Sequence, residues 1–244
     1  MDIYRQKLSE HEIKDKILEH HNSIKSNKKS RFNQTVSLID GHSRKVLDYG
    51  CGWGSIAKEL YERGHDVTGI DLIANEIEIC RRVWGENEHL KFKHTSILDI
   101  NDASFDVVIS NQVIEHVHNA GTYLSEINRV LVDQGELVIT LPNVLSPKII
   151  SWNFRNNLSR VLKKTNQNII NGFDKRSLHI NAWDPLHFTH LVSTLGFELM
   201  DFRMSEGLVF PFGIKFHFPF FKNNYYTMCF KLKKVKRIEI KPTD

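Results

Sequence analysis

The stretch VLDYGCGWGSIAKEL, residues 46–60, decides how the rest of the chain is interpreted. A short apolar run is followed by three glycines within five positions, Gly50, Gly52 and Gly54, and then by a helix-like pattern. A strand that turns sharply into a helix brings amide N–H groups and the helix N-terminus to one point, and glycines let a ligand lie against that backbone. The stretch therefore predicts a nucleotide site at the carboxyl edge of a strand, although a tight turn without a ligand can show the same glycines.

Short apolar runs and helix-like segments alternate on both sides of this turn as far as residue 143. The runs read as strands are residues 45–50, 66–72, 90–97, 105–111 and 135–143; the helical segments are 54–66, 74–85 and 119–135. A further helix at 184–196 and strands at 197–204 and 225–234 follow. This order predicts an α/β fold with a seven-stranded, mostly parallel, doubly wound sheet.

The chain of 244 residues is expected to form one domain, residues 1–244. Residues 1–45 show two helical stripes separated by a charged link, SIKSNKKSR, and are expected to form an N-terminal helical cap. Residues 144–182 form an insert after the fifth strand, with seven basic residues against one acid and a net charge of +6. Both segments are expected to cover the carboxyl edge of the sheet.

Composition narrows the class of protein further. No apolar run approaches the length of a membrane-spanning helix, and the polar N-terminus does not resemble a secretory signal. Cys51, Cys80 and Cys229 are far apart and show no CxxC spacing, which argues against a disulfide framework or a thiolate metal site. These features predict a cytoplasmic protein, and the net charge of +4 permits an anionic partner without requiring one.

Asp71 ends the second predicted strand 21 positions after Gly50, the spacing at which a carboxylate reaches the two hydroxyls of a ribose. An aspartate that only caps the next helix is the alternative. A dinucleotide fingerprint would place its third glycine at position 55, which is Ser55, and Asp48 before the turn would repel a pyrophosphate. The pattern favours a nucleoside that carries a cation, and a nicotinamide-dependent oxidoreductase is the rival interpretation.

These residues resemble the class I S-adenosylmethionine-dependent methyltransferases, closest in pattern to the ubiquinone-biosynthesis O-methyltransferases and other small-molecule methyltransferases. The segments VLDYGCGWG, VTGIDL, SFDVVISNQVIEHV and GELVITLPN carry the resemblance, which is strong over residues 40–143. It implies S-adenosyl-L-methionine as cofactor and methyl transfer as the activity.

The resemblance also implies roles for individual residues. The three glycines, with Cys51 between them, would approach the methionine and ribose part of the cofactor. Asp48 would bind its amino group, and Asp71 would bind the ribose. In the adenine region it places Leu72, Ile97, Leu98 and Asp99, with the Asp99 acid facing the adenine amino group. Asn111 would lie near the transferred methyl group. The bulky Trp53 departs from the small residue often found in this turn, which leaves its role open.

Two histidines are candidates for a catalytic base, because an oxygen nucleophile must lose a proton. His116 follows the fourth strand, and His179 lies near the end of the insert, where the resemblance places acceptor contacts. Packing is the alternative role for each. His116 with His118, and His187 with His190, lack further ligands at metal spacing, so no metal site is predicted. The segment SNQV lacks the Asn/Asp-Pro-Pro-aromatic run of many amino-methylating enzymes, which favours O-methylation without excluding N- or C-acceptors.

The acceptor is expected to be a small molecule, a sugar or a lipid-linked compound, and the basic insert favours an anionic one. Residues 210–221 hold six phenylalanines in twelve positions, which predicts either a pocket floor or peripheral contact with a membrane. No recognised RNA-binding module is present, which argues against nucleic acid. The remaining alternatives are an RNA or protein methyltransferase and a catalytically silent cofactor-binding domain; the oligomeric state stays open.

Overall fold

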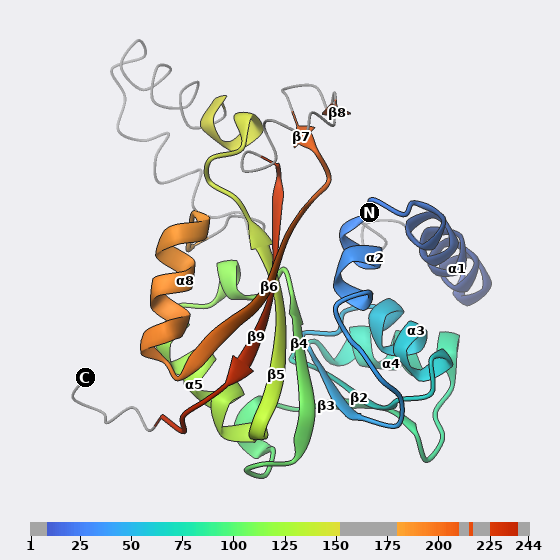
Figure 1. Ribbon diagram of the computed structural model, residues 1–244. Coiled ribbons are helices and arrows are strands. Elements are labelled where there is room, and N and C mark those ends of the chain that lie inside the picture. Colours follow the sequence, from blue (N-terminus) through green and yellow to red (C-terminus); the bar gives the residue numbers. More distant parts are fainter. Residues whose placement is uncertain (1–8, 152–179, 210–214, 217–224, 239–244) are drawn as a thin grey trace, which may run out of the picture.

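The computed structural model describes residues 9–151, 180–209, 215–216 and 225–238, and its centre is a seven-stranded sheet (Figure 1). The strand order is β3-β2-β1-β4-β5-β9-β6. The strand β9 runs in the opposite direction to the other six, which are parallel to one another. The strands are β1 Lys45–Tyr49, β2 Asp66–Asp71, β3 Leu90–His94, β4 Phe105–Asn111, β5 Leu131–Pro142, β6 Phe197–Ser205 and β9 Thr227–Lys234. A separate pair joins β7 Leu208–Val209 to β8 Lys215–Phe216. The predicted fold class is confirmed.

Helices cover both faces of this sheet (Figure 1). The helices α2, α3 and α4 pack on one face, α5 and α8 pack on the other, and α1 lies outside against α2 and α4. Their bounds are α1 Glu10–Ser26, α2 Arg31–Val36, α3 Ser55–Glu62, α4 Ala74–Trp84, α5 Ala120–Val130 and α8 Pro185–Thr194. Because the order of the strands reverses between β1 and β4, the carboxyl ends of these two strands border the crevice in which doubly wound sheets bind ligands.

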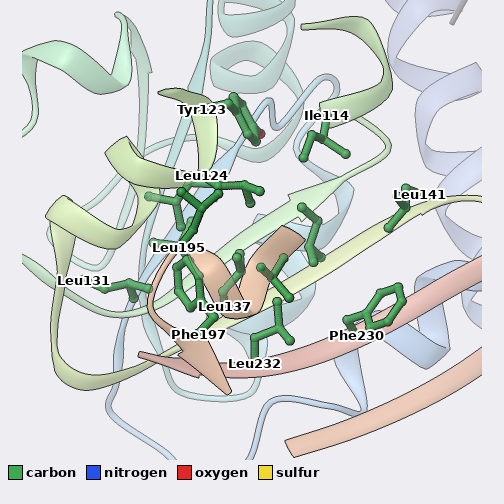
Figure 2. Close-up of a cluster of buried hydrophobic side chains, with 14 of the residues drawn as sticks. Ile114, Tyr123, Leu124, Leu131, Leu137, Leu141, Leu195, Phe197, Phe230 and Leu232 are labelled. Atoms are coloured by element: carbon green, nitrogen blue, oxygen red, sulfur yellow. The ribbon is translucent and has the colours of Figure 1, made fainter. Parts of the chain in front are cut away.

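The strands divide their side chains between two cores, as expected when successive residues point to opposite faces. In β5, Leu137, Ile139 and Leu141 join the core under α5 and α8, whereas Val138 joins the core under α2, α3 and α4. Figure 2 shows the first core, which combines Leu137 and Leu141 of β5 with Phe230 and Leu232 of β9 and Phe197 of β6. Burial on both faces explains why the strands read as nearly continuous apolar runs.

The segment 131–135, predicted as the end of a helix, is the start of β5, so that prediction is wrong. The helix α5 ends at Val130, and Leu131 already pairs with Phe105 of β4. Gln134 has a φ of 63°, which no helix accommodates, and Gly135 follows it. Pairing with β4 therefore outweighs the helical spacing of Val130 and Leu131, an example of tertiary contacts that override local periodicity.

The N-terminal helices form at strong capping signals. Ser9 and Glu12 make a reciprocal capping box at α1, and the Ser30 side chain accepts a hydrogen bond from the Asn33 N–H at α2. The first helix buries Ile17, and the second buries Phe32 and Val36 in the core with α3 and α4. Within the described residues, none of the helices is both long and apolar enough to cross a membrane.

Two predicted features lie largely outside the described residues. The insert is described only at its ends, where residues 147–151 are helical and the Ile180 and Asn181 N–H groups donate to the Glu115 carbonyl (2.7 and 3.1 Å). Of the phenylalanine-rich segment 210–221, only Lys215 and Phe216 in β8 are described.

Truncation of Phe230 should show how much the core of β9 contributes to stability. This side chain is fully buried and lies 4.9 Å from the Phe188 ring and 4.7 Å from the Phe202 ring, between centroids. We expect Phe230→Ala to lower the free energy of unfolding by about 3–5 kcal/mol, measured by urea denaturation. Leu186→Ala, at a side chain that is 76% exposed, serves as the control and should change it by less than about 0.5 kcal/mol. Equal effects of the two substitutions would contradict the assignment of this core.

Candidate functional site

The glycine turn connects β1 directly to α3, and all three glycines have positive φ angles of 75°, 50° and 71°. The Gly50 and Cys51 N–H groups both donate to the Ile70 carbonyl of β2, at 2.9 and 3.0 Å. The Gly54 N–H donates back to the Cys51 carbonyl at 2.9 Å. The turn is thus held by its own backbone and by the neighbouring strand, at the carboxyl edge of the sheet.

The three glycines have different surroundings. A Cβ atom on Gly50 would lie 2.5 Å from Val113 Cγ2, and one on Gly54 would lie 2.8 Å from Phe92 Cε1, so packing requires a glycine at both positions. A Cβ atom on Gly52 would meet nothing within 4 Å. Gly52 is therefore the glycine whose backbone faces open space and is accessible to a ligand.

Asp71 lies beside this open backbone. Its Oδ2 atom accepts the Gly52 N–H at 3.0 Å, and its Oδ1 atom accepts the Ile73 N–H at 2.9 Å. The carboxylate therefore ties the end of β2 to the glycine turn and holds the turn before α4, whose N-cap has no side-chain hydrogen bond, and its role toward a ribose stays a prediction. Each carboxylate oxygen keeps a second lone pair for a further donor.

Asp48, the residue before Tyr49, is 2% exposed. Its Oδ2 atom accepts the Ala57 N–H of α3 at 3.2 Å. Burial raises the pKa of Asp48 to about 7, and the charge of Asp71 contributes in the same direction. A cation placed next to this carboxyl would stabilise its ionised form.

A cavity of about 310 Å³ opens next to the turn, within the size range of ligand pockets. One wall comes from the edge of the sheet and the glycine turn, and the other from the N-terminal helices. The lining residues are His20, Ile24, Ser30, Arg31, Phe32, Asp48, Gly50, Cys51, Trp53, Ser55, Ile56, Asn111 and Glu206. Four of the predicted cofactor residues, Asp48, Gly50, Cys51 and Asn111, are thus brought together in one cavity.

Sequence reasoning missed the charged groups on the cap side of this cavity. Arg31, the first residue of α2, lies 3.8 Å from Glu206, which follows β6, and both line the cavity. Arg31 was assigned to a solvated link, and its neighbours Lys28 and Lys29 are indeed exposed. The serine cap at residue 30 was the signal that a helix starts there and turns the next side chain inward.

The predicted adenine-binding residues do not line this cavity. Leu72, after β2, and Leu98, after β3, are 68% and 67% exposed, whereas Ile97 is buried in the core under α5. The Asp99 carboxylate is turned back onto its own turn and accepts the Thr95 hydroxyl at 2.9 Å and the Ser96 N–H at 3.4 Å. Its primary contacts are therefore structural, and its role toward adenine stays a prediction.

Of the two predicted catalytic histidines, only His116 is described, and it does not line the cavity. His116 is exposed at the end of the short helix Ile114–His116, and His179 lies outside the described residues. Asn111 is better placed, because it lines the cavity and its Oδ1 atom accepts the Thr140 hydroxyl at 2.6 Å. Within the described ranges, no three His, Cys, Asp or Glu side chains come together in a way that could hold a metal ion.

Three comparisons with known proteins bear on this site. A family model described as a methyltransferase domain matches residues 47–139. The ubiquinone biosynthesis O-methyltransferase of Rickettsia bellii is 31% identical over 120 residues, which cover 46% of this chain and 50% of that protein. The chain thus spans about half the length of the curated relatives it matches.

Two solved structures share the fold. The 1,6-didemethyltoxoflavin-N1-methyltransferase of Burkholderia thailandensis, solved with its substrate and S-adenosylhomocysteine, matches with a TM-score of 0.60 and 17% identity over 95% of this chain and 92% of that one. The [4+2]-cyclase SpnF matches with a TM-score of 0.58 and 16% identity over 83% of this chain and 80% of that one. Likeness at this level of identity concerns the fold alone.

The methyltransferase-domain match, the strand order and the glycine turn together identify residues 47–139 as a methyltransferase domain with the fold of the class I S-adenosylmethionine-dependent family. S-adenosylmethionine is the cofactor of this family. The residues present fit it, because the open backbone at Gly52 is bordered by one acid that can accept two hydroxyls and by a second that favours a neighbouring cation.

Glu115 adds a titratable group near this site. It is 1% exposed, and neither of its carboxylate oxygens has a hydrogen-bond partner. Burial raises the pKa of Glu115 to about 7. Because the unfolded chain ionises near pH 4.5 whereas the native protein keeps this proton up to about pH 7, Glu115 lowers the stability of the native state progressively between these values.

The substitution Glu115→Gln should therefore change the pH dependence of stability. The free energy of unfolding of this variant minus that of the unmodified protein should be larger at pH 8 than at pH 5 by roughly 2 kcal/mol, since the isosteric amide does not ionise. Urea denaturation at the two pH values measures this difference. Glu88→Gln, at a side chain that is 84% exposed, is the matched control and should show no such change. If the free energies of unfolding of Glu115→Gln and of the unmodified protein differ by the same amount at both pH values, the assigned burial of Glu115 is contradicted.

Proposed function

We propose that this protein transfers the methyl group of S-adenosylmethionine to an oxygen atom of a small-molecule or lipid-linked acceptor. The observation that carries the proposal is the open backbone at Gly52, held by Asp71 at the end of the neighbouring strand. A ribose placed on Gly52 would find the carboxylate of Asp71 within reach of its hydroxyls. The in-line displacement itself requires mainly alignment of nucleophile, carbon and sulfur.

The cavity supports a specific orientation for the charged end of this cofactor. Its methionine part carries an ammonium and a carboxylate, so it needs an anion and a cation that face each other. Asp48 and Asn111 supply acceptor oxygens on the sheet side, and Arg31 supplies the guanidinium on the cap side. We assign the ammonium to Asp48 and the carboxylate to Arg31.

The surface beyond Asp71 supports the placement of the base. Leu72, Ile73 and Leu98 are 68%, 55% and 67% exposed, which is unusual for large apolar side chains near the end of a sheet. An adenine ring packed on these side chains would remove apolar surface from water. Leu72 and Leu98 are thus the proposed adenine contacts, with Asp99 at the edge of the same turn.

Two observations support the acceptor class. The curated relatives are named as O-methyltransferases of ubiquinone biosynthesis, although the match covers about half of their length. The sequence of the insert, residues 144–182, has a net charge of +6, which suits an acidic or phosphate-bearing acceptor. Membrane contact through residues 210–221 and the role of His179 as a base remain predictions from the sequence.

Cofactor binding can be tested at Asp71. We expect Asp71→Ala to weaken binding of S-adenosylhomocysteine by at least about tenfold, because two ribose hydroxyls lose a charged acceptor. Isothermal titration calorimetry measures the dissociation constant. Asp66→Ala, at the other end of β2, is the matched control and should leave it unchanged. Equal affinity of both variants would refute the ribose assignment.

Transferase activity can be tested with labelled cofactor. Protein incubated with S-adenosyl-[methyl-³H]methionine and a panel of catechols, sugars and polyprenyl-linked phenols should label one class, which mass spectrometry then assigns to oxygen, nitrogen or carbon. Tight cofactor binding without turnover on any acceptor would favour a silent cofactor-binding domain. SpnF, which has this fold but is named a cyclase, shows why the assay is needed.

A further inference from the structure

The cavity contains one imidazole within the described part of the chain, that of His20 on α1. Nothing in its local sequence marks it as a functional residue. The folded chain brings it to the cap-side wall of the cavity that Asn111 borders from the end of β4.

Aromatic packing sets the orientation of the His20 ring. The ring meets the indole of Trp53 edge to face, with 5.9 Å between centroids and 85° between planes. Trp53 is held in turn, because its carbonyl accepts the indole N–H of Trp84 on α4 at 2.6 Å. Trp53, the bulky residue of the glycine turn, thus packs against His20 and supports its ring.

The ring nitrogens of His20 have no hydrogen-bond partner among the residues that the structure describes. The Nδ1 atom of the neighbouring His21 also has no hydrogen-bond partner, but that ring is buried between Phe32 and Trp84 and does not line the cavity. A neutral imidazole that borders a ligand cavity with an unused nitrogen can accept a proton.

The surrounding charges favour the neutral imidazole. Although His20 is exposed overall, partial desolvation of its ring lowers its pKa below the ordinary value of 6.5, and the positive charge of Arg31 on α2 acts in the same direction. The acids that line the cavity are Asp48 on β1 and Glu206 after β6, and Glu206 lies next to Arg31. Both effects favour the neutral form of His20, whereas Arg31 carries a permanent positive charge.

His20 and Arg31 therefore have different roles. The carboxylate of the cofactor needs a charged partner, which Arg31 provides, so His20 is left for the acceptor. Resting on the methyl-transfer function proposed above, we propose that His20 is the catalytic base that removes the proton from the hydroxyl of the methyl acceptor.

The step balances without any additional reactant. The acceptor oxygen forms a bond to the methyl carbon while the bond from that carbon to sulfur breaks, and the electron pair of the broken bond stays on sulfur. The hydroxyl proton moves to a ring nitrogen of His20, which later releases it to water. Arg31 and Asp48 keep their charges throughout.

Two variants separate a base from a packing residue. His20→Phe keeps an aromatic ring against Trp53 but has no nitrogen, and His20→Gln keeps polarity without a titratable group. For both, we expect kcat to fall by about 100-fold or more with the acceptor identified by the labelling assay. His11→Gln, at an exposed histidine on the same helix that pairs with Asp15, is the matched control and should keep full activity.

The pH profile and nuclear magnetic resonance give readouts that packing alone would not move. The kcat of the unmodified protein should decrease below pH 6.5, as the base becomes protonated, and this limb should vanish in both variants. The His20 ring signal, assigned by its absence in His20→Gln, should titrate at the pH of that limb. Calorimetry should show binding of S-adenosylhomocysteine within threefold of the unmodified protein.

The outcomes distinguish this inference from the proposed function. Activity of His20→Phe within threefold of the unmodified protein, or a pH limb that persists in it, would overturn the base role while methyl transfer stands. A loss of cofactor affinity that parallels the loss of kcat would also overturn it and make His20 a cofactor contact. Absence of cofactor binding or of turnover in the unmodified protein would instead reject the proposed function, and this inference with it.

Discussion

The hydrogen bond from the Gly52 N–H to the Asp71 carboxylate is the contact on which the site depends. It joins the turn after β1 to the end of β2, two segments that parallel pairing already places side by side. The Cys80 thiol of α4 supports the same turn, donating to the Gly52 carbonyl at 3.0 Å. The peptide groups on both sides of Gly52 are thereby fixed while its Cα faces open space. A rigid backbone with a bare surface is what a nucleoside site needs, because order is established before the ligand arrives.

Burial of carboxyl groups near this edge has a consequence for stability as well as for binding. Asp48 and Glu115 are both almost fully buried, and each has its pKa raised to about 7. Asp48 accepts one backbone N–H, whereas Glu115 has no partner for either oxygen. Groups of this kind lower native stability at neutral pH, and they accumulate at functional sites where a ligand or a proton compensates for the missing partner.

The N-terminal helices complete the cavity and hold its basic groups. The first is attached to the body of the protein by the ion pair of Lys25 with Glu59 at 2.6 Å, and the second by burial of Phe32 and Val36. Through these contacts Arg31 and His20 face the carboxyl edge of a sheet whose first strand begins at Lys45. The N-terminal helices therefore contribute polar and charged side chains to the cavity wall.

Much of this protein could be derived from its sequence, because the signals were local. The apolar runs, the glycines at 50, 52 and 54, and the acid 21 positions later predicted the doubly wound sheet and the position of its ligand crevice, since strand ends of a parallel sheet share one edge. Tertiary structure decided the rest, for reasons that spacing does not encode. Pairing with β4 turned residues 131–135 into a strand, packing against Val113 and Phe92 left Gly52 as the accessible glycine, and the docking of α1 and α2 brought His20 and Arg31 to the cavity. Each of these outcomes depends on contacts between residues that are far apart in the sequence, and only the folded chain determines those contacts.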